Sequence, residues 1–276
     1  MSANGSRHQF DEATRLTFHD GIYTGNTSAA YANMVGPFGG VIGAQLLNAV
    51  LEHPKREGEP IAITINYAAP IKDGEFTIKA TPVRTNRSTQ HWVIDLSQDD
   101  NILATATAVT ASRRETWSAP DLKPPSVPSP DQVPSLPNLP NAGLPDWVSN
   151  YDIRIIRGFP DILSDNPPEN EDSETLQWIE DKPKRPLDAL SLASMSDAFF
   201  PRVFIRQNKI LPASTVSLTI YFHADESTFA NYGAQPVLGH ARALRFYNGY
   251  FDQTAEMWSQ DGKLLASSTQ VVYYRD

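Results

Sequence analysis

The carboxylate Asp197 stands late in a segment of mostly apolar and small residues, 187–201, whose other carboxylate, Asp188, lies at its start. At 3.6 residues per turn, a helix through this segment places Asp197 on one stripe with Leu190 and Ala193. A helix that is apolar on most sides is normally buried, and burial raises the pKa of a carboxyl group. A buried carboxylate can act as a general base toward water. The plainer alternative is a capping or solvated aspartate, the usual role of such a residue near a helix end.

The same segment carries its own boundary signals. Asp188 has the side chain of an N-cap, and Pro201 cannot continue a helical hydrogen-bond ladder. The pattern therefore predicts a helix over residues 188–200, with Asp197 late in it. A second apolar helix is predicted over 41–51, entered through Phe38-Gly39-Gly40. Glycines at a helix start let a ligand approach the first backbone N–H groups, and they equally allow tight helix–sheet packing.

Composition limits the possible functions. The chain has 276 residues and a net charge of −9, which disfavours a nucleic-acid partner. Cysteine is absent, so disulfides and thiolate chemistry are excluded, and the six histidines show no metal-ligand spacing. His223 ends a strand-like run, where a structural role is more frequent than catalysis. No segment is long and apolar enough to span a bilayer and residues 1–20 are polar, so we expect a cytoplasmic protein without metal or cofactor.

Strand-like runs follow each predicted helix. A turn at His19-Asp20-Gly21 lies within a first hairpin over 15–24. The remaining predicted strands are 61–69, 75–85, 90–97, 102–112, 150–157, 174–180, 214–223, 236–247, 250–259 and 263–274. Few helices beside many consecutive strands predict an α+β fold with antiparallel sheets.

The chain also shows an internal repeat around a proline-rich connector. Nine prolines fall between Ala119 and Pro145, which is typical of an extended linker and less so of a ligand for a recognition domain. The run 63–67 (Ile-Thr-Ile-Asn-Tyr) parallels 218–222 (Leu-Thr-Ile-Tyr-Phe), and 100–109 parallels 261–271 with one inserted residue. We therefore expect an N-terminal unit over 1–118, a linker over 119–147 and a C-terminal unit over 148–276.

With these features assembled, the chain resembles the double-hotdog acyl-CoA thioesterases, the type II thioesterase group. The most specific stretches are Ser196-Asp197, the run 214–223 and the run from Asp261-Gly262 to Gln270, while the first half resembles its counterpart through Phe38-Gly39-Gly40. The resemblance covers essentially the whole chain. It implies two fused hotdog units, each an antiparallel sheet wrapped around a central helix.

The resemblance also implies a site and an activity. In the family an Asp, a Thr or Ser and a Gln hold the hydrolytic water, and the matching positions are Asp197, Thr215 and Gln270. The implied reaction is hydrolysis of acyl-CoA, or a related acyl thioester, to acid and thiol. A backbone N–H at Gly39 or Gly40 is our candidate for binding the thioester carbonyl.

The two halves do not match at this site. Aligning Ala104 with Ala266 places Ala108 opposite Gln270, and the first helix has no carboxylate before Glu52. We therefore expect one active centre per chain, in the C-terminal half.

Thr215 presents a difficulty. Under strict alternation it faces away from the apolar side of its strand, which carries Val216 and Leu218. A β-bulge would return it to the inner face.

Two other functions share the fold. One is hydration or dehydration of an enoyl thioester, whose enzymes pair the helix Asp with a His that is missing after Asp197. The other is acyl-thioester binding without catalysis. Three basic residues after the helix, Arg202, Arg206 and Lys209, are candidates for coenzyme A phosphates, although a solvated basic turn is the simpler interpretation. We expect an acyl-CoA substrate, no nucleic-acid or membrane partner, and a homo-oligomer.

Overall fold

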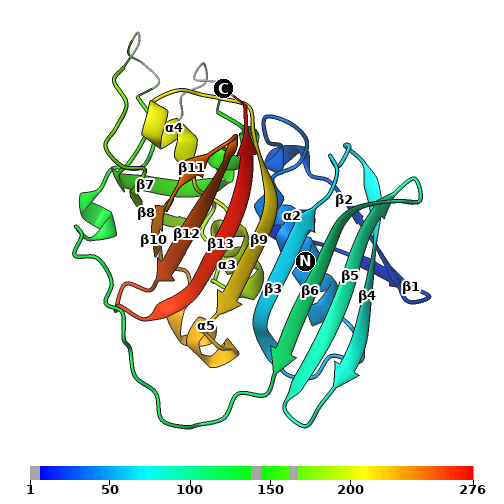
Figure 1. Ribbon diagram of the computed structural model, residues 1–276. Helices are drawn as coiled ribbons and strands as arrows, with labels where there is room; N and C mark the ends of the chain where they lie inside the picture. The colour runs from blue at the N-terminus through cyan, green and yellow to red at the C-terminus, as the bar shows by residue number, and fades with distance from the viewer. Residues whose placement is uncertain (1–6, 138–143, 162–163, 165–166, 276) are drawn as a thin grey trace, which may run out of the picture.

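One antiparallel sheet runs through the whole protein (Figure 1). The computed structural model describes residues 7–137, 144–161, 164 and 167–275. Residues 1–6 of the expected N-terminal unit, 138–143 of the expected linker, and 162–163, 165–166 and 276 of the expected C-terminal unit lie outside the described part. Along the sheet the strands follow the order β1-β2-β4-β5-β6-β3-β9-β13-β12-β10-β8-β7, and β11 pairs with β12. Strands β1 to β6 belong to the first half of the chain, and β7 to β13 belong to the second. The two halves join where β3 pairs with β9.

The first half of the chain contains the elements α1 (Gln9–Ala13), β1 (Thr17–His19), β2 (Ile22–Asn26), η1 (Ala29–Tyr31), α2 (Gly39–Leu51), β3 (Glu59–Tyr67), β4 (Glu75–Thr85), β5 (Thr89–Gln98) and β6 (Asn101–Ala111). The predicted strands and helix are confirmed here within a few residues. Asp20 and Gly21 have positive φ values of 49° and 85°, as the tight β1–β2 turn requires. The short helix α1 was not predicted.

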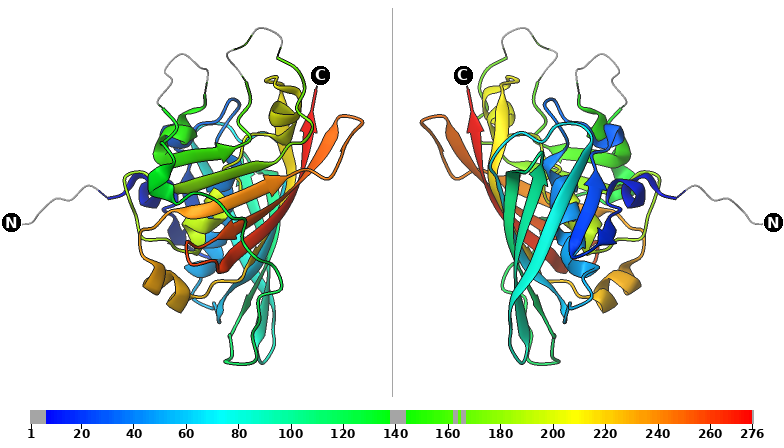
Figure 2. Two further views of the ribbon diagram at one scale, coloured as in Figure 1. Left: turned by 90° about the vertical axis from the view of Figure 1, so that its left-hand side faces the viewer. Right: turned by 90° about the vertical axis from the view of Figure 1, so that its right-hand side faces the viewer.

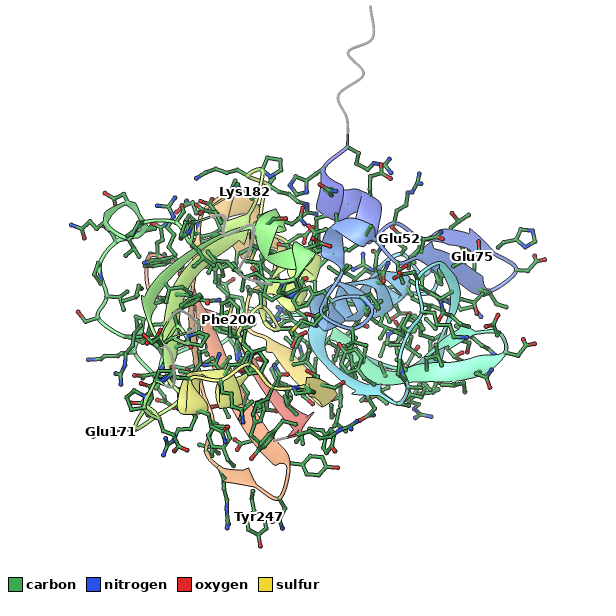
Figure 3. The ribbon with its side chains drawn as sticks, turned by 90° about the horizontal axis from the view of Figure 1, so that it is seen from above. Glu52, Glu75, Glu171, Lys182, Phe200 and Tyr247 are labelled. Atoms are coloured by element: carbon green, nitrogen blue, oxygen red, sulfur yellow. The ribbon has the colours of Figure 1, made fainter. Side chains whose placement is uncertain are left out.

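The second half contains the elements η2 (Pro130–Gln132), η3 (Asp146–Asn150), β7 (Tyr151–Arg157), β8 (Thr175–Asp181), α3 (Ala189–Met195), α4 (Arg202–Gln207), β9 (Ala213–Phe222), α5 (Glu226–Tyr232), β10 (Val237–Arg242), β11 (Phe246–Tyr247), β12 (Tyr250–Trp258) and β13 (Leu264–Tyr274). The prediction of one strand over 236–247 was wrong. The Asp252 carboxylate accepts hydrogen bonds from the backbone N–H groups of Leu244 and Arg245, which turns the chain out of the ladder. The resulting hairpin carries Tyr247 at its outer end (Figure 3).

Two buried helices lie against the inner side of the sheet, whose curvature is visible in Figure 2. Every residue of α2 from Gly40 to Val50 is buried, and the helix packs on β3, β4, β5 and β6. The helix α3 packs on β8 and against α2. An all-round apolar sequence such as that of α2 is stable only when structure encloses it, and here the sheet and α3 do so.

The strand register confirms the internal repeat. Ile63 pairs with Ala108 in the first half, and Leu218 pairs with Gln270 in the second. The alignment derived from sequence is thus also the alignment of the two sheets. At the junction, the Thr64 and Thr219 hydroxyls, equivalent residues of the two halves, lie 3.0 Å apart in a hydrogen bond.

The proline-rich segment is docked on the outer face of the sheet rather than held away from it. Trp178 Nε1 donates to the Pro128 carbonyl at 2.9 Å, and Val133 is buried in a cluster with Trp178, Leu238 and Trp258. Prolines keep the described part of this segment, up to residue 137, extended, and Figure 1 shows it running from the end of β6 along the outside of the molecule. No helix in the described part of the chain has the length and apolarity that crossing a membrane requires.

Candidate active site

Asp197 lies just beyond the end of α3, in a tight turn. The predicted helix over 188–200 begins as expected, with Asp188 accepting a hydrogen bond from the Ser191 N–H at 2.8 Å. It ends earlier than predicted, at Met195. Sheet side chains take the carbonyls that a continuing helix would use: Ser268 donates to the Ser196 carbonyl and Gln177 to that of Ala198. This termination turns the Asp197 side chain toward the sheet.

Asp197, Gln270 and Thr215 form one hydrogen-bonded chain. Gln270 Nε2 donates to Asp197 Oδ1 at 3.2 Å, and Thr215 Oγ1 donates to Gln270 Oε1 at 3.1 Å. The two bonds fix the orientation of the Gln270 amide, because its oxygen accepts on one side and its nitrogen donates on the other. The structure therefore brings together all three residues, from a turn and two strands that are far apart in the sequence.

A β-bulge directs Thr215 to the site. In the pairing of β13 with β9, Val271 is opposite Ser217 but Val272 is opposite Thr215, so Val216 is the extra residue. Val216 is consequently 40% exposed although it has the parity of the buried Leu218. The bulge resolves the difficulty seen in the sequence, since it shifts Thr215 onto the face that carries Gln270.

The first half of the chain contributes the start of α2 to this site. A Cβ atom built on Gly39 would lie 2.9 Å from Asp197 Oδ2, and one built on Gly40 would lie 2.6 Å from the Ser194 carbonyl oxygen. The Gly40 backbone also hydrogen-bonds to the Asp197 carboxylate. The two glycines thus allow α2 to approach α3 and the Asp197 turn closely, a packing role that the sequence analysis did not name.

Tyr67 is a residue of the site that the sequence analysis missed. Its hydroxyl donates to the Gly39 carbonyl at 2.8 Å and is 3.5 Å from the Gly39 Cβ position. Burial raises the pKa of Tyr67 well above its usual value, and the Asp197 charge raises it further, so the hydroxyl remains a donor. The internal repeat held the signal, because Tyr67 is the equivalent of Phe222 and is the polar member of that pair.

The electrostatics of Asp197 suit a base. Burial raises its pKa to about 7, while the hydrogen bonds from Gln270 and the Gly40 backbone oppose the rise. Only 9% of the residue is exposed. A carboxylate with a pKa near neutrality is both ionised often enough and basic enough to take a proton from water.

The three basic residues after the helix differ in exposure: Arg202 is buried, Arg206 is partly buried and Lys209 is exposed. Arg202 is completely buried and donates to the carbonyl of Ser173 and to the Thr175 hydroxyl, at 2.9 and 2.7 Å. It therefore holds backbone together and cannot bind coenzyme A phosphates. Arg206 pairs with Glu169 at 3.1 Å. His223 is exposed and bonded to Ser267, away from Asp197 and its partners.

Two models of acyl-CoA thioesterase domains match the chain. The family model "Acyl-CoA thioesterase N-terminal domain" matches residues 28–112, and "Acyl-CoA thioesterase C-terminal domain" matches residues 130–274. A Haemophilus influenzae protein named "Putative esterase" is 30% identical over 95 residues, which are 33% of this chain and 61% of that protein. The chain thus spans less than two thirds of the length of the curated relative it matches.

Solved structures share the fold. A conserved protein of unknown function with hot dog fold from Alicyclobacillus acidocaldarius is 45% identical, with a TM-score of 0.92 and 98% of each chain covered. Acyl-CoA thioesterase II TesB2 from Mycobacterium marinum is 17% identical, with a TM-score of 0.74 over 96% of this chain and 98% of that one, and shows likeness of fold alone. Because the two family models together cover most of its length, the chain belongs to the acyl-CoA thioesterase family with the hot dog fold.

Proposed function

We propose that the protein hydrolyses acyl-CoA, or a related acyl thioester, to a carboxylic acid and a thiol. The observation that carries this proposal is the buried Asp197 carboxylate, whose Oδ1 accepts from Gln270 and whose Oδ2 lies against the start of α2 at Gly39. We place the water and the thioester at this contact between Asp197 and the start of α2.

In the proposed reaction Asp197 takes a proton from water as the water oxygen bonds to the thioester carbonyl carbon. The carbonyl electron pair moves onto oxygen, and the first-turn N–H of Gly39, which has no acceptor within the helix, donates to it. The carbonyl then re-forms and the carbon–sulfur bond breaks. Asp197 returns the proton to the departing thiolate, so the products are the acid and the thiol. Gln270 and Thr215 hold the carboxylate and the water in place without adding charge.

The proposal includes the architecture that supports this site. We infer two fused hotdog units, one around α2 and one around α3, with boundaries at 1–118, 119–147 and 148–276. Their close contact is what lets the first unit supply Gly39, Gly40 and Tyr67 to a base carried by the second. One site per chain follows, because Ala108 replaces Gln270 in the first unit.

The competing dehydratase function would need a histidine paired with Asp197, and the described residues supply none. The described hydrogen-bond partners of Asp197 are an amide side chain and backbone groups, and none is a histidine.

The test of the proposed hydrolysis uses purified protein, straight-chain acyl-CoAs of graded length and a thiol reagent. We expect thiol release with a preferred chain length. Double-bond chemistry without thiol release, or binding without turnover, would overturn the proposal.

A homo-oligomer is part of the proposal as well. The outer face of β9, β13 and β12 exposes a group of large apolar side chains: Val216, Tyr221, Val271, Tyr273 and Tyr250. Contiguous apolar surface on a sheet face is frequently covered by another copy. Light scattering should give a mass above that of one chain, and Val271→Lys should lower it.

A further inference from the structure

A third strand, β12, places a polar side chain, Gln253, beside the candidate site. Gln253 on β12 is directly opposite Gln270 on β13, and directly opposed residues point to the same face with Cβ atoms roughly 5 Å apart. Thr215 on β9 borders Gln270 on the other side. Three polar side chains therefore form a row across three neighbouring strands, with Gln270 in the centre.

Gln253, the member of this row on β12, has an amide nitrogen without a partner among the described residues. Gln253 is 3% exposed, and its Nε2 is buried without a hydrogen-bond partner among the described residues. Gln90, a buried glutamine of β5, is different: its amide bonds to the Glu57 N–H, the Lys55 carbonyl and the Thr85 hydroxyl. An unpaired buried amide lowers stability, so a side chain with no partner in the protein is one that a ligand can satisfy.

The first half, where no active centre is expected, has apolar residues at the positions equivalent to Gln253 and Gln270. Ala108, the equivalent of Gln270, is paired with Trp92 on β5, so Trp92 is the equivalent of Gln253. Trp92 is 1% exposed and Ala108 3% exposed. A large apolar ring and a small apolar residue fill the space that two glutamines occupy in the second half. The polar pair is thus confined to the half that carries Asp197.

We propose that Gln253 Nε2 donates a hydrogen bond to the thioester carbonyl oxygen, as a second donor beside the Gly39 backbone. The proposal rests on the proposed thioester hydrolysis. A neutral amide suits this role because it stabilises developing negative charge on oxygen without lowering the basicity of Asp197 as a cation would. The contact strengthens as the carbonyl becomes an oxyanion, so its loss affects turnover more than substrate binding.

The first experiment compares Gln253→Met with Gln90→Met. Methionine keeps length and removes the amide. For Gln253→Met we expect kcat to fall by about 10²–10³-fold, the usual effect of losing one oxyanion donor, with a melting temperature equal to or above that of the wild type. For Gln90→Met we expect the reverse, a lower melting temperature and unchanged kcat. A kcat for Gln253→Met within about twofold of wild type would overturn the proposal.

The pH profile separates direct contact from an indirect effect. If Gln253 touches the substrate, the Met variant retains the wild-type midpoint of the pH–rate curve. If it acts by orienting Gln270, the bond to Asp197 changes and the midpoint moves, which would contradict direct contact.

A binding experiment tests the contact independently of hydrolysis. The probes are two coenzyme A thioethers of equal chain length, a 2-oxoalkyl-CoA that keeps a carbonyl and an alkyl-CoA that lacks one. Gln253→Met should weaken binding of the first at least about fivefold and leave the second unchanged. Absence of thiol release by the wild-type protein would overturn the hydrolase proposal while this selective weakening would still support the carbonyl contact. Equal effects on both probes, or binding of neither by the wild type, would overturn the contact.

Discussion

The two halves of the molecule have the same order of strand pairing, but their inner faces differ in polarity at the equivalent positions. In the second half the positions next to the helix end carry Asp197, Gln270 and a bulge that adds Thr215. In the first half the equivalent sheet position is Ala108, against Trp92. A repeated fold therefore does not imply a repeated site, because a site needs several polar residues that the scaffold itself does not require.

Polar residues in the first helix support structure instead. Gln45 Nε2 donates to the Ala13 carbonyl at 2.6 Å and Asn48 Nδ2 to the Thr14 carbonyl at 3.0 Å, so both hold the N-terminal segment. In the proposed site, the first half contributes the backbone at Gly39 and the Tyr67 hydroxyl that donates to the Gly39 carbonyl. The comparison indicates that, in the proposed site, the second half contributes side chains and the first half contributes the close approach of a helix start.

The largest expected effect comes from removing the base. Asp197→Asn should lower kcat by about 10³-fold or more, because the amide keeps the shape and cannot take a proton. The matched control is Asp181→Asn. Asp181 is also buried, and burial raises its pKa to about 7 as well, but its side chain has no hydrogen bond to Gln270 or Thr215. Thiol-release assays should show near-normal turnover for Asp181→Asn. Similar losses in both variants would mean that Asp197 acts through stability alone.

The next effect tests the contribution of the first half. In Gly39→Ala the new methyl group lies 2.9 Å from Asp197 Oδ2, so we expect kcat to fall by about 10²-fold, the usual result of misplacing reacting groups. Gly43→Ala is the control one turn later, where the methyl group lies 3.0 Å from the terminal Cδ1 of Ile65 and 3.6 Å from the Tyr67 hydroxyl, and higher helix propensity offsets the crowding. Steady-state kinetics should separate the two variants; equal activity would remove the start of α2 from the site.

The pH dependence is a smaller effect with a defined sign. Because the ionised form of Asp197 is the base and its pKa is about 7, kcat/KM should fall about tenfold for each pH unit below 7 and level off above it. Stability changes in the opposite sense. A carboxyl whose pKa is raised on folding from 3.8 favours the folded state below its unfolded pKa, and this contribution is lost as pH rises through the folded pKa.

Melting temperatures of Asp197→Asn and the wild type test that sign. The difference between them should shift in favour of the variant from pH 4 to pH 7 and then stay constant. Asp181→Asn should show the same window with unaltered turnover, since the cause, burial of a carboxyl group, is the same. A pH–rate midpoint at pH 4 in the wild type would contradict burial as the origin of the activity profile.

Periodic patterns and turn residues predicted most of the sheet, because strand faces and positive-φ turns are local properties. The residues Asp99 and Asp100, with φ values of 49° and 61°, turn the chain from β5 to β6 where the sequence indicated. What local patterns did not predict were the ends set by distant partners. The helix stops at Met195 because Gln177 and Ser268 bind the following carbonyls, and no local residue encodes those bonds.

The candidate site divides in the same way. Asp197 was visible as a carboxylate in an apolar segment, whereas Thr215 and Gln270 depended on the family resemblance. Tyr67 and Gln253 were missed because each looks like an ordinary strand residue. They stand out only when the two halves are aligned through the strand register. In that alignment the equivalent of Tyr67 is Phe222, and the equivalent of Gln253 is Trp92.

The smallest expected effect distinguishes hydroxyl groups of the two halves. Tyr67→Phe removes the donor to the Gly39 carbonyl, so the start of α2 becomes less firmly placed and kcat should fall about three- to tenfold, with about 1 kcal/mol of stability lost. Tyr151→Phe is the matched control in the second half, where the hydroxyl hydrogen-bonds to Ser194 at 2.8 Å and not to Gly39. It should cost similar stability and leave kcat unchanged. If the two variants reduced kcat equally, placement of Gly39 would have no special weight, and the first half would be a scaffold rather than a partner in the site.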